Sequence, residues 1–122
     1  MNVRSLLRRN AIYYADKDAF INGDKTFTFA QCWTRGLRLA NGLLDLGLQS
    51  GDHIAVLEYN SLRSIDFFLA SAIAGFVRVP LYPKSSPLQH KFSLELTRCK
   101  ALVCDETCTA EIEGLEEKTE GL

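Results

Sequence analysis

The chain has 122 residues, of which 47% are hydrophobic and 24% charged, and its formal net charge is −1. This length fits one domain or part of one, and the apolar content is sufficient for a core, which excludes a globally disordered chain. The near balance of charges provides no basic face for nucleic acid. The sequence has neither the run of roughly 18 apolar residues that a transmembrane helix needs nor an apolar N-terminal segment typical of a secretory signal. We therefore expect a cytoplasmic protein.

The cysteines are expected to be free thiols, because disulfides are rare in cytosolic proteins that have an ordinary core. The four positions are Cys32, Cys99, Cys104 and Cys108. No C-x-x-C pair occurs among them, so free thiols are favoured over the alternative of a zinc site.

A helix is predicted over residues 3–15, where Leu7, Ala11 and Tyr14 recur at helical spacing. Three basic residues lie mostly on the opposite face: Arg4, Arg8 and Arg9. We interpret that face as solvated, with contact to a membrane surface as the alternative. Residues 19–29 then predict a β-hairpin, whose turn is formed by Asn22, Gly23 and Asp24.

A second helix is predicted to begin with a capping box formed by Thr28 and Gln31 and to end at Gly47. Its expected buried stripe consists of Trp33, Leu37, Ala40 and Leu44. Gly36 and Gly42 lie inside this helix and weaken it by about 1 kcal/mol each relative to Ala, which suggests close packing against a neighbour.

The middle of the chain predicts alternating strands and helices from about residue 53 to residue 104. The expected strands are 53–57, 76–79 (closed by Pro80) and 101–104. One helix is capped by Asn60 or Ser61 and ends at Gly75, and the other begins with a capping box at Ser86 and Gln89, with Pro87 in the first helical position. The expected inner face of the first helix contains Leu62, Ile65, Leu69, Ala72 and Ile73, and that of the second contains Leu88, Phe92, Leu96 and Cys99. Crossover helices of this length imply parallel strands, so the fold class is α/β: a hairpin and a small, mostly parallel sheet of about three strands flanked by helices.

The glutamate-rich stretch 111–120 predicts a solvated helix face or a frayed end, with an acidic interaction tail as the alternative. Three parallel strands would leave an open sheet edge, so we expect further sequence to follow. Residues 1–106 are therefore interpreted as an incomplete domain and 107–122 as an acidic end, truncated or frayed. Apolar surface exposed in this way favours a homo-oligomer or a domain swap.

Five stretches in this order resemble the N-terminal part of the adenylate-forming superfamily, which includes acyl-CoA synthetases, luciferases and peptide-synthetase adenylation domains. They are LLRRNAIYYADKDAFI, TFTFAQ, LANGLLDLGLQSGDHIAVLEYNS, FFLASAIAGFVRVPLYP and KALVCDE. The resemblance extends from about residue 3 to residue 106 and favours fatty acyl-CoA synthetases or fatty acyl-AMP ligases. One departure is Arg78, where small or apolar residues are more usual, which suggests a sheet edge or a partner.

The resemblance implies a ligase that uses ATP and Mg²⁺ to convert a carboxylic acid into an acyl-adenylate. Within the family, the resemblance favours a fatty acid as the substrate. The acyl group is then transferred to CoA or a carrier. In this family the catalytic and nucleotide-binding parts lie downstream of the region represented here. We therefore expect no catalytic, cofactor-binding or metal-binding residue in this chain, which would be inactive alone and would have the remainder of the enzyme as its partner.

Several residues could substitute for the missing site, but we interpret them as structural. Lys84, Ser85 and Ser86 lack the glycine that a phosphate loop requires, so a helix cap is favoured. The remaining candidates are two histidines and two aspartates. His53 and His90 are expected at the surface or in structural positions. Asp52 is expected to accept backbone N–H groups in a turn, and Asp66 is expected to face solvent. Two alternatives to the ligase segment remain: a stand-alone interaction or regulatory module derived from such an enzyme, and a small nucleotide-binding domain with its own activity.

Overall fold

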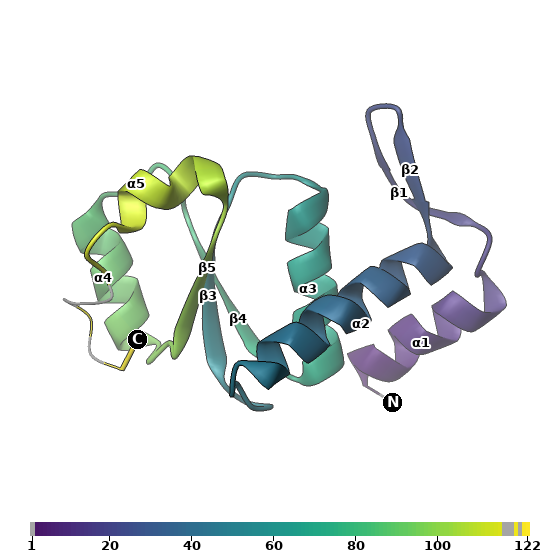
Figure 1. Cartoon of the computed structure of the whole chain (residues 1–122), viewed down its shortest axis with the longest axis horizontal. Helices are drawn as coiled ribbons and strands as arrows, with labels where there is room; N and C mark the ends of the chain where they lie inside the picture. The colour runs from purple at the N-terminus through teal and green to yellow at the C-terminus, as the bar shows by residue number, and fades with distance from the viewer. Residues whose placement is uncertain (1, 116–118, 120) are drawn as a thin grey trace. The chain divides into compact units, whose positions relative to one another are not determined.

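The computed structural model describes residues 2–115, 119, 121 and 122, and the chain divides into two compact units. One unit is formed by residues 1–50 and 60–75, and the other by residues 51–59 and 76–122. Their helices and strands are labelled in Figure 1. The combination of an antiparallel hairpin with a parallel three-stranded sheet and helices confirms the predicted α/β fold class.

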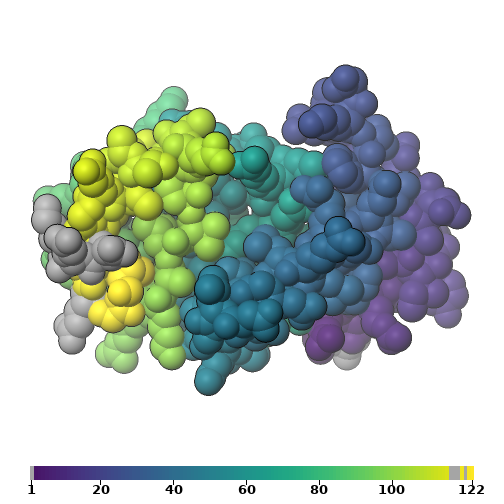
Figure 2. All heavy atoms as spheres, viewed as in Figure 1, coloured from purple at the N-terminus to yellow at the C-terminus, as the bar shows by residue number. Residues whose placement is uncertain are grey.

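The first unit contains three helices and the hairpin. Its elements are α1 (Val3–Tyr13), β1 (Asp18–Asn22), β2 (Lys25–Thr28), α2 (Phe29–Asp45) and α3 (Leu62–Ala74). The helix predicted over 3–15 ends earlier, at Tyr13. β1 and β2 pair antiparallel around Gly23, whose φ of +64° is readily adopted by glycine, and this confirms the predicted hairpin. The hairpin projects away from α1 and α2 (Figures 1 and 2).

The capping box of α2 is present as predicted. The Gln31 amide donates to Thr28 Oγ1 (3.2 Å), and the Thr28 amide donates to Gln31 Oε1 (2.9 Å). These two bonds satisfy amides that have no partner within the first helical turn. Gly47 follows the end of the helix with φ +99°, so the predicted stop is also confirmed.

Three residues of the stripe predicted for α2 lie in or against the core: Ala40 is buried, and Trp33 and Leu37 pack against the same cluster. The fully buried residues of α2 are Cys32, Gly36, Ala40 and Leu43. Leu44, which was expected inside, is 40% exposed, so that prediction is wrong. The face is determined by its smallest residues, because they allow α3 to approach: a Cβ built on Gly36 would lie 3.0 Å from Leu69 Cβ. The expected close packing is thus confirmed at Gly36, but it is wrong for Gly42, which has nothing within 4 Å.

The second unit is built on a parallel sheet in the order β4-β3-β5, as the crossover pattern predicts. Its elements are β3 (His53–Leu57), β4 (Val77–Leu81), α4 (Pro87–Leu96), β5 (Ala101–Cys104), the 3-10 helix η1 (Glu106–Cys108) and α5 (Thr109–Ile112). The central strand β3 is buried from Ile54 to Leu57, in agreement with its continuous apolar sequence. On one sheet face, Ala55, Leu57 and Leu81 pack with Leu94 and Cys99 in a single core.

Strand β4 continues through Pro80 to Leu81, so the predicted end before Pro80 is wrong. The reason lies in the direction of the backbone amides. The Val77 amide donates to the Asp52 carbonyl at 2.9 Å, and the alternation of a strand then directs the Pro80 nitrogen away from β3. Because β4 is an edge strand, the missing N–H of Pro80 removes no bond within the sheet.

Helix α4 begins with the predicted capping box, in which the Gln89 amide donates to Ser86 Oγ at 3.3 Å. Its predicted inner face is wrong, however. Leu88, Phe92 and Leu96 are 76%, 65% and 70% exposed. His90 and Leu94 are buried in their place, and of the predicted set only Cys99 is buried. His90 Nε2 lies 3.5 Å from Glu111 Oε2, but neither atom has a hydrogen-bond partner among the described residues.

Two glycines of one helix provide a matched test of the close packing between α2 and α3. Gly36→Ala gains helix propensity but places a Cβ against Leu69, and we expect a net loss of about 1 kcal/mol or more in the free energy of unfolding. Gly42→Ala meets open space and should gain about 1 kcal/mol. Urea denaturation of both variants measures the difference, and equal gains would contradict the close approach at Gly36.

Arg98 follows α4 with φ +52°, the left-handed region that non-glycine residues occupy at a cost. The side chain is exposed, so its replacement should act mainly through the backbone. We expect Arg98→Gly to raise the free energy of unfolding by about 1 kcal/mol. Arg98→Ala is the control, because it retains the Cβ and should give no such gain. If the two variants have equal thermal stability, the backbone explanation is wrong.

Candidate functional site

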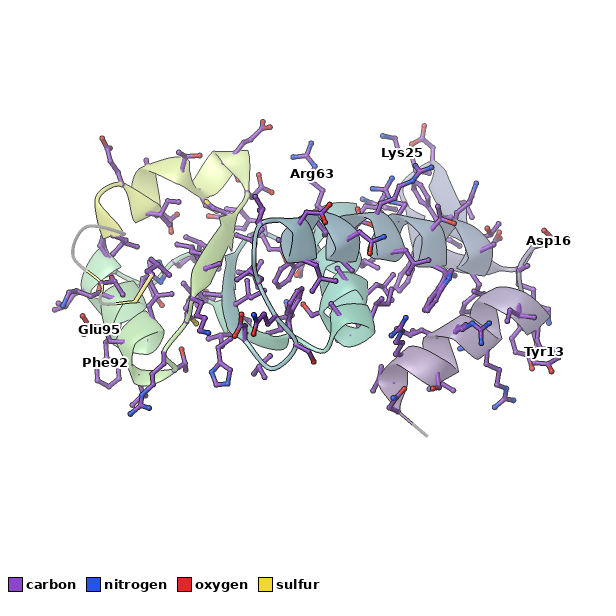
Figure 3. The ribbon with its side chains drawn as sticks, turned by 60° about the horizontal axis from the view of Figure 1, so that its bottom comes forward. Tyr13, Asp16, Lys25, Arg63, Phe92 and Glu95 are labelled. Carbon is purple, nitrogen blue, oxygen red and sulfur yellow. The ribbon has the colours of Figure 1, made fainter. Side chains whose placement is uncertain are left out.

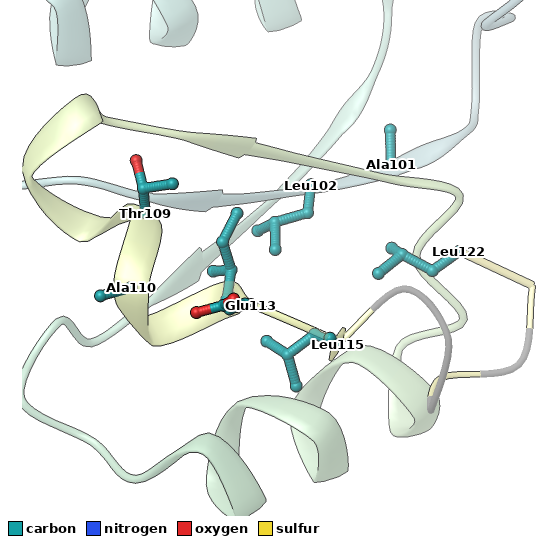
Figure 4. A pocket seen from close by; sticks show the side chains of 9 residues that line it. Ala101, Leu102, Thr109, Ala110, Glu113, Leu115 and Leu122 are labelled. Carbon is teal, nitrogen blue, oxygen red and sulfur yellow. The ribbon is translucent and has the colours of Figure 1, made fainter.

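A groove in the second unit lies beside β5, with a volume of about 820 Å³ (Figure 4). Ala101 and Leu102 of the edge strand form one side, and the segment from α5 to Leu115 forms the other. The groove exists because β5 has no further strand beside it in the described chain and α5 is only four residues long. Its lining is mainly apolar, and the ionisable side chain among the lining residues is that of Glu113. This groove suits an apolar group better than a phosphate.

A second candidate is the carboxyl end of the parallel sheet. β3 lies in the middle with β4 and β5 on either side, and open α/β sheets bind ligands where the strand order reverses in this way. Glu58 follows β3, and Asp105 and Glu106 follow β5. Sequence reasoning did not identify this edge, although an acidic residue directly after each of two apolar strands was a usable signal.

The acidic residues at this edge have structural contacts. The Asp105 carboxylate accepts a hydrogen bond from the Thr107 amide (3.1 Å) and so caps η1, while its own amide donates to the Leu57 carbonyl (3.0 Å). Across the described residues, no three His, Cys, Asp or Glu side chains are grouped so as to hold a metal ion.

The serines of the loop before α4 serve the backbone. The Ser85 amide donates to the Tyr82 carbonyl at 2.9 Å in a turn, and Ser86 Oγ accepts from the Gln89 amide. The interpretation of Ser86 as a helix cap is therefore confirmed.

The two histidines lie in different structural settings. His53 begins β3, and its Nδ1 lies 2.6 Å from the Thr97 carbonyl oxygen. His90 is buried on α4 facing Glu111. Among the described residues, neither histidine forms a hydrogen bond with a serine or cysteine that would make a nucleophile and base pair. Each lies between two segments of the second unit.

The two aspartates both form ion pairs. Asp52 Oδ1 lies 3.0 Å from Lys100 Nζ, so the Asp52 carboxylate forms an ion pair with a lysine side chain. Asp66 was expected to face solvent, and that expectation is wrong, since its side chain is only 14% exposed. Arg35 donates to both of its oxygens, from Nε (2.9 Å) and Nη2 (2.6 Å), and this bond further raises the pKa of Arg35. Helical periodicity gives no signal for a pair that is 31 residues apart.

All four cysteines are free thiols. Burial, followed by the nearby charges of Cys108, Asp105 and Glu111, raises the pKa of Cys104 to about 11. Burial also raises the pKa of Cys32 and of Cys99. A thiol with a raised pKa has little thiolate at neutral pH, so these three cysteines are poor nucleophiles.

Arg78 lies on β4, at the sheet edge that the sequence suggested for it. Its Nε is buried and has no hydrogen-bond partner in the described part of the chain.

Among the described residues, no helix is long and apolar enough to cross a membrane.

Comparison with known proteins identifies what this scaffold is similar to. The family model described as "AMP-binding enzyme" matches residues 7–121. The 2-succinylbenzoate–CoA ligase of Arabidopsis thaliana is 38% identical over 74 residues, which cover 61% of this chain and 13% of that protein. The mitochondrial medium-chain acyl-CoA ligase ACSF2 of Bos taurus is 36% identical over 62% of this chain and 12% of its own length.

Among solved structures, the fatty acyl CoA synthetase of Mycobacterium tuberculosis superposes with a TM-score of 0.86 and 26% identity. The superposition covers 93% of this chain and 23% of that structure. The chain therefore spans less than a quarter of each of these three proteins. Sequence motifs already indicated a resemblance to adenylate-forming acyl-CoA synthetases. Because the family model covers nearly the whole sequence, the chain belongs to the AMP-binding enzyme family.

Proposed function

We propose that this chain is the N-terminal part of a ligase that activates a carboxylic acid with ATP. A carboxylate oxygen of the substrate would displace pyrophosphate from the α-phosphorus to give an acyl-adenylate, and the acyl group would then pass to CoA or a carrier. The observation that carries this proposal is the family match over residues 7–121, together with relatives named as CoA ligases. A fatty acid is favoured as the substrate because a medium-chain acyl-CoA ligase and a fatty acyl CoA synthetase are among the similar proteins.

We infer that the described residues do not hold ATP. The groove beside β5 is mainly apolar and contains the carboxylate of Glu113, which would repel a phosphate. The N-terminus of α4 has no glycine-rich loop before it, and its cap is occupied by the Ser86 and Gln89 side chains. We therefore propose that ATP, Mg²⁺ and CoA bind elsewhere in the ligase.

The role proposed for this chain is a scaffold. Its polar side chains are used for caps and ion pairs, as in Arg35 with Asp66 and Lys100 with Asp52. Such contacts hold helices and strands in place without exposing a reactive group. In a longer ligase they would support the domain that contains the acyl and nucleotide pockets.

The proposal predicts that the purified 122-residue chain has no nucleotide site. Its melting temperature should be unchanged by millimolar Mg·ATP or CoA, because a ligand stabilises a protein only if it binds the folded state. Differential scanning fluorimetry measures this shift, with an inert salt at equal ionic strength as the control. A reproducible rise of several degrees with ATP would overturn the scaffold role and support a nucleotide-binding domain with its own activity.

The activity itself is tested on the protein as the source cell makes it. Its intact mass should be several times the 13.7 kDa of this chain. That product should catalyse fatty-acid-dependent exchange of labelled pyrophosphate into ATP, whereas the 122-residue chain should not. A mass near 13.7 kDa with no exchange would contradict the ligase and favour an interaction module.

A further inference from the structure

The outward side of α1 carries arginines together with large apolar residues. The inner side of this helix, with half-buried Leu7 and Ala11, packs against α2 and α3. At about 3.6 residues per turn, residues four apart form rows along a helix, and two such rows lie next to each other on the outward side of α1. The rows are Arg4, Arg8 and Ile12, and Ser5, Arg9 and Tyr13. All six residues are exposed.

The positive charge on this side is not neutralised within the described part of the chain. Among the described residues, no ion pair involves Arg4, Arg8 or Arg9. Residues 1–15 contain no aspartate or glutamate, and the first acidic residue, Asp16, lies beyond the end of the helix. The three guanidinium groups can therefore bind phosphate oxygens without first breaking an ion pair.

Each of the two rows ends in a large apolar residue. Ile12 is 60% exposed and Tyr13 is 74% exposed. Figure 3 shows the Tyr13 side chain pointing outward at the end of α1. Tyrosine combines an apolar ring with a polar hydroxyl, and such residues are enriched where a protein meets the interface of a bilayer.

The combination of charge and apolar surface distinguishes between the anions that could bind here. A nucleic acid would use the arginines, but its phosphate backbone offers nothing apolar to Ile12. The surface of an anionic bilayer offers both, because headgroup phosphates lie directly above acyl chains. It is therefore the partner whose chemistry matches both kinds of residue on α1.

We propose that α1 docks the protein on the surface of membranes that contain anionic phospholipid. The three arginines bind headgroup phosphates, and Ile12 and Tyr13 enter the boundary between headgroups and acyl chains. Because few charges and few apolar side chains take part, the binding is reversible and weakened by salt. This proposal is independent of the ligase activity.

The first test is co-sedimentation with lipid vesicles, for both the purified 122-residue chain and the protein as the source cell makes it. We expect at least about fivefold more binding to vesicles with about one-third phosphatidylserine than to pure phosphatidylcholine, and loss of most of this binding at about 0.5 M salt. No preference for the anionic vesicles would overturn the proposal. Binding by the 122-residue chain alone would overturn it too, because another part of the longer protein would then cover α1.

Removal of charge tests the role of the arginines. The double variant Arg8→Gln, Arg9→Gln should bind anionic vesicles at least about tenfold more weakly, because two of the three contacts with phosphate are lost. The matched control is Lys84→Gln, Arg98→Gln, which removes the same charge from exposed positions of the second unit and should bind within about twofold of the unmodified chain. An equal loss in both double variants would show that only net charge matters and would contradict docking through α1.

Removal of apolar surface separates a membrane from other anions. Ile12→Ser, Tyr13→Ser should weaken vesicle binding at least about fivefold, whereas Leu88→Ser, Phe92→Ser on α4, at 76% and 65% exposure, should leave it unchanged. Full binding by the Ile12→Ser, Tyr13→Ser variant would show that the arginines recognise phosphate alone, as in nucleic acid, and would overturn the membrane proposal. Circular dichroism of each variant confirms that its helices are still folded.

Discussion

The central strand β3 imposes the main constraint on the second unit. Its backbone is buried from Ile54 to Leu57, and a buried backbone must find hydrogen-bond partners on both sides. Those partners are β4 and β5, which follow it by about 20 and 45 residues along the chain. Parallel pairing then requires crossovers, and α4 is the crossover that places its Leu94 on the sheet. At the amino end of β3, Asp52 forms an ion pair with Lys100 and His53 contacts the Thr97 carbonyl oxygen.

The first unit depends on a close approach of two helices rather than on a strand. Gly36 and Ala40 leave room for α3, and the resulting short distance brings Arg35 within reach of both oxygens of Asp66. The guanidinium of Arg35 also lies 5.0 Å from the ring centroid of Phe27 on β2. One arginine therefore contacts α3 and the hairpin from α2, beside the glycine at which the two helices approach closely.

Local signals were read well from the sequence, whereas signals that depend on the rest of the fold were not. The capping boxes at Thr28 and Ser86 and the turn at Gly23 involve residues within three positions of each other, so their chemistry is visible in the sequence. The inner face of α4 was misassigned because hydrophobicity alone places Phe92 inside and His90 outside. Buried His90 faces Glu111, which is 21 positions away on another helix, so its environment is not visible in the local sequence. The family resemblance identified the scaffold, yet the sequence contained no motif for a reactive site in these residues.

The two edges of the small sheet, β4 and β5, differ in how well each can pair with an additional strand. On β4, the outward nitrogen of Pro80 has no hydrogen, so a strand added beside it would lose one bond of its ladder. On β5, the uncharged run Ala101–Cys104 contains no proline. The sheet can therefore be extended at low cost on one side only, and Pro80 disfavours edge-to-edge pairing at β4. Insertions that enlarge this sheet during evolution would be tolerated best next to β5.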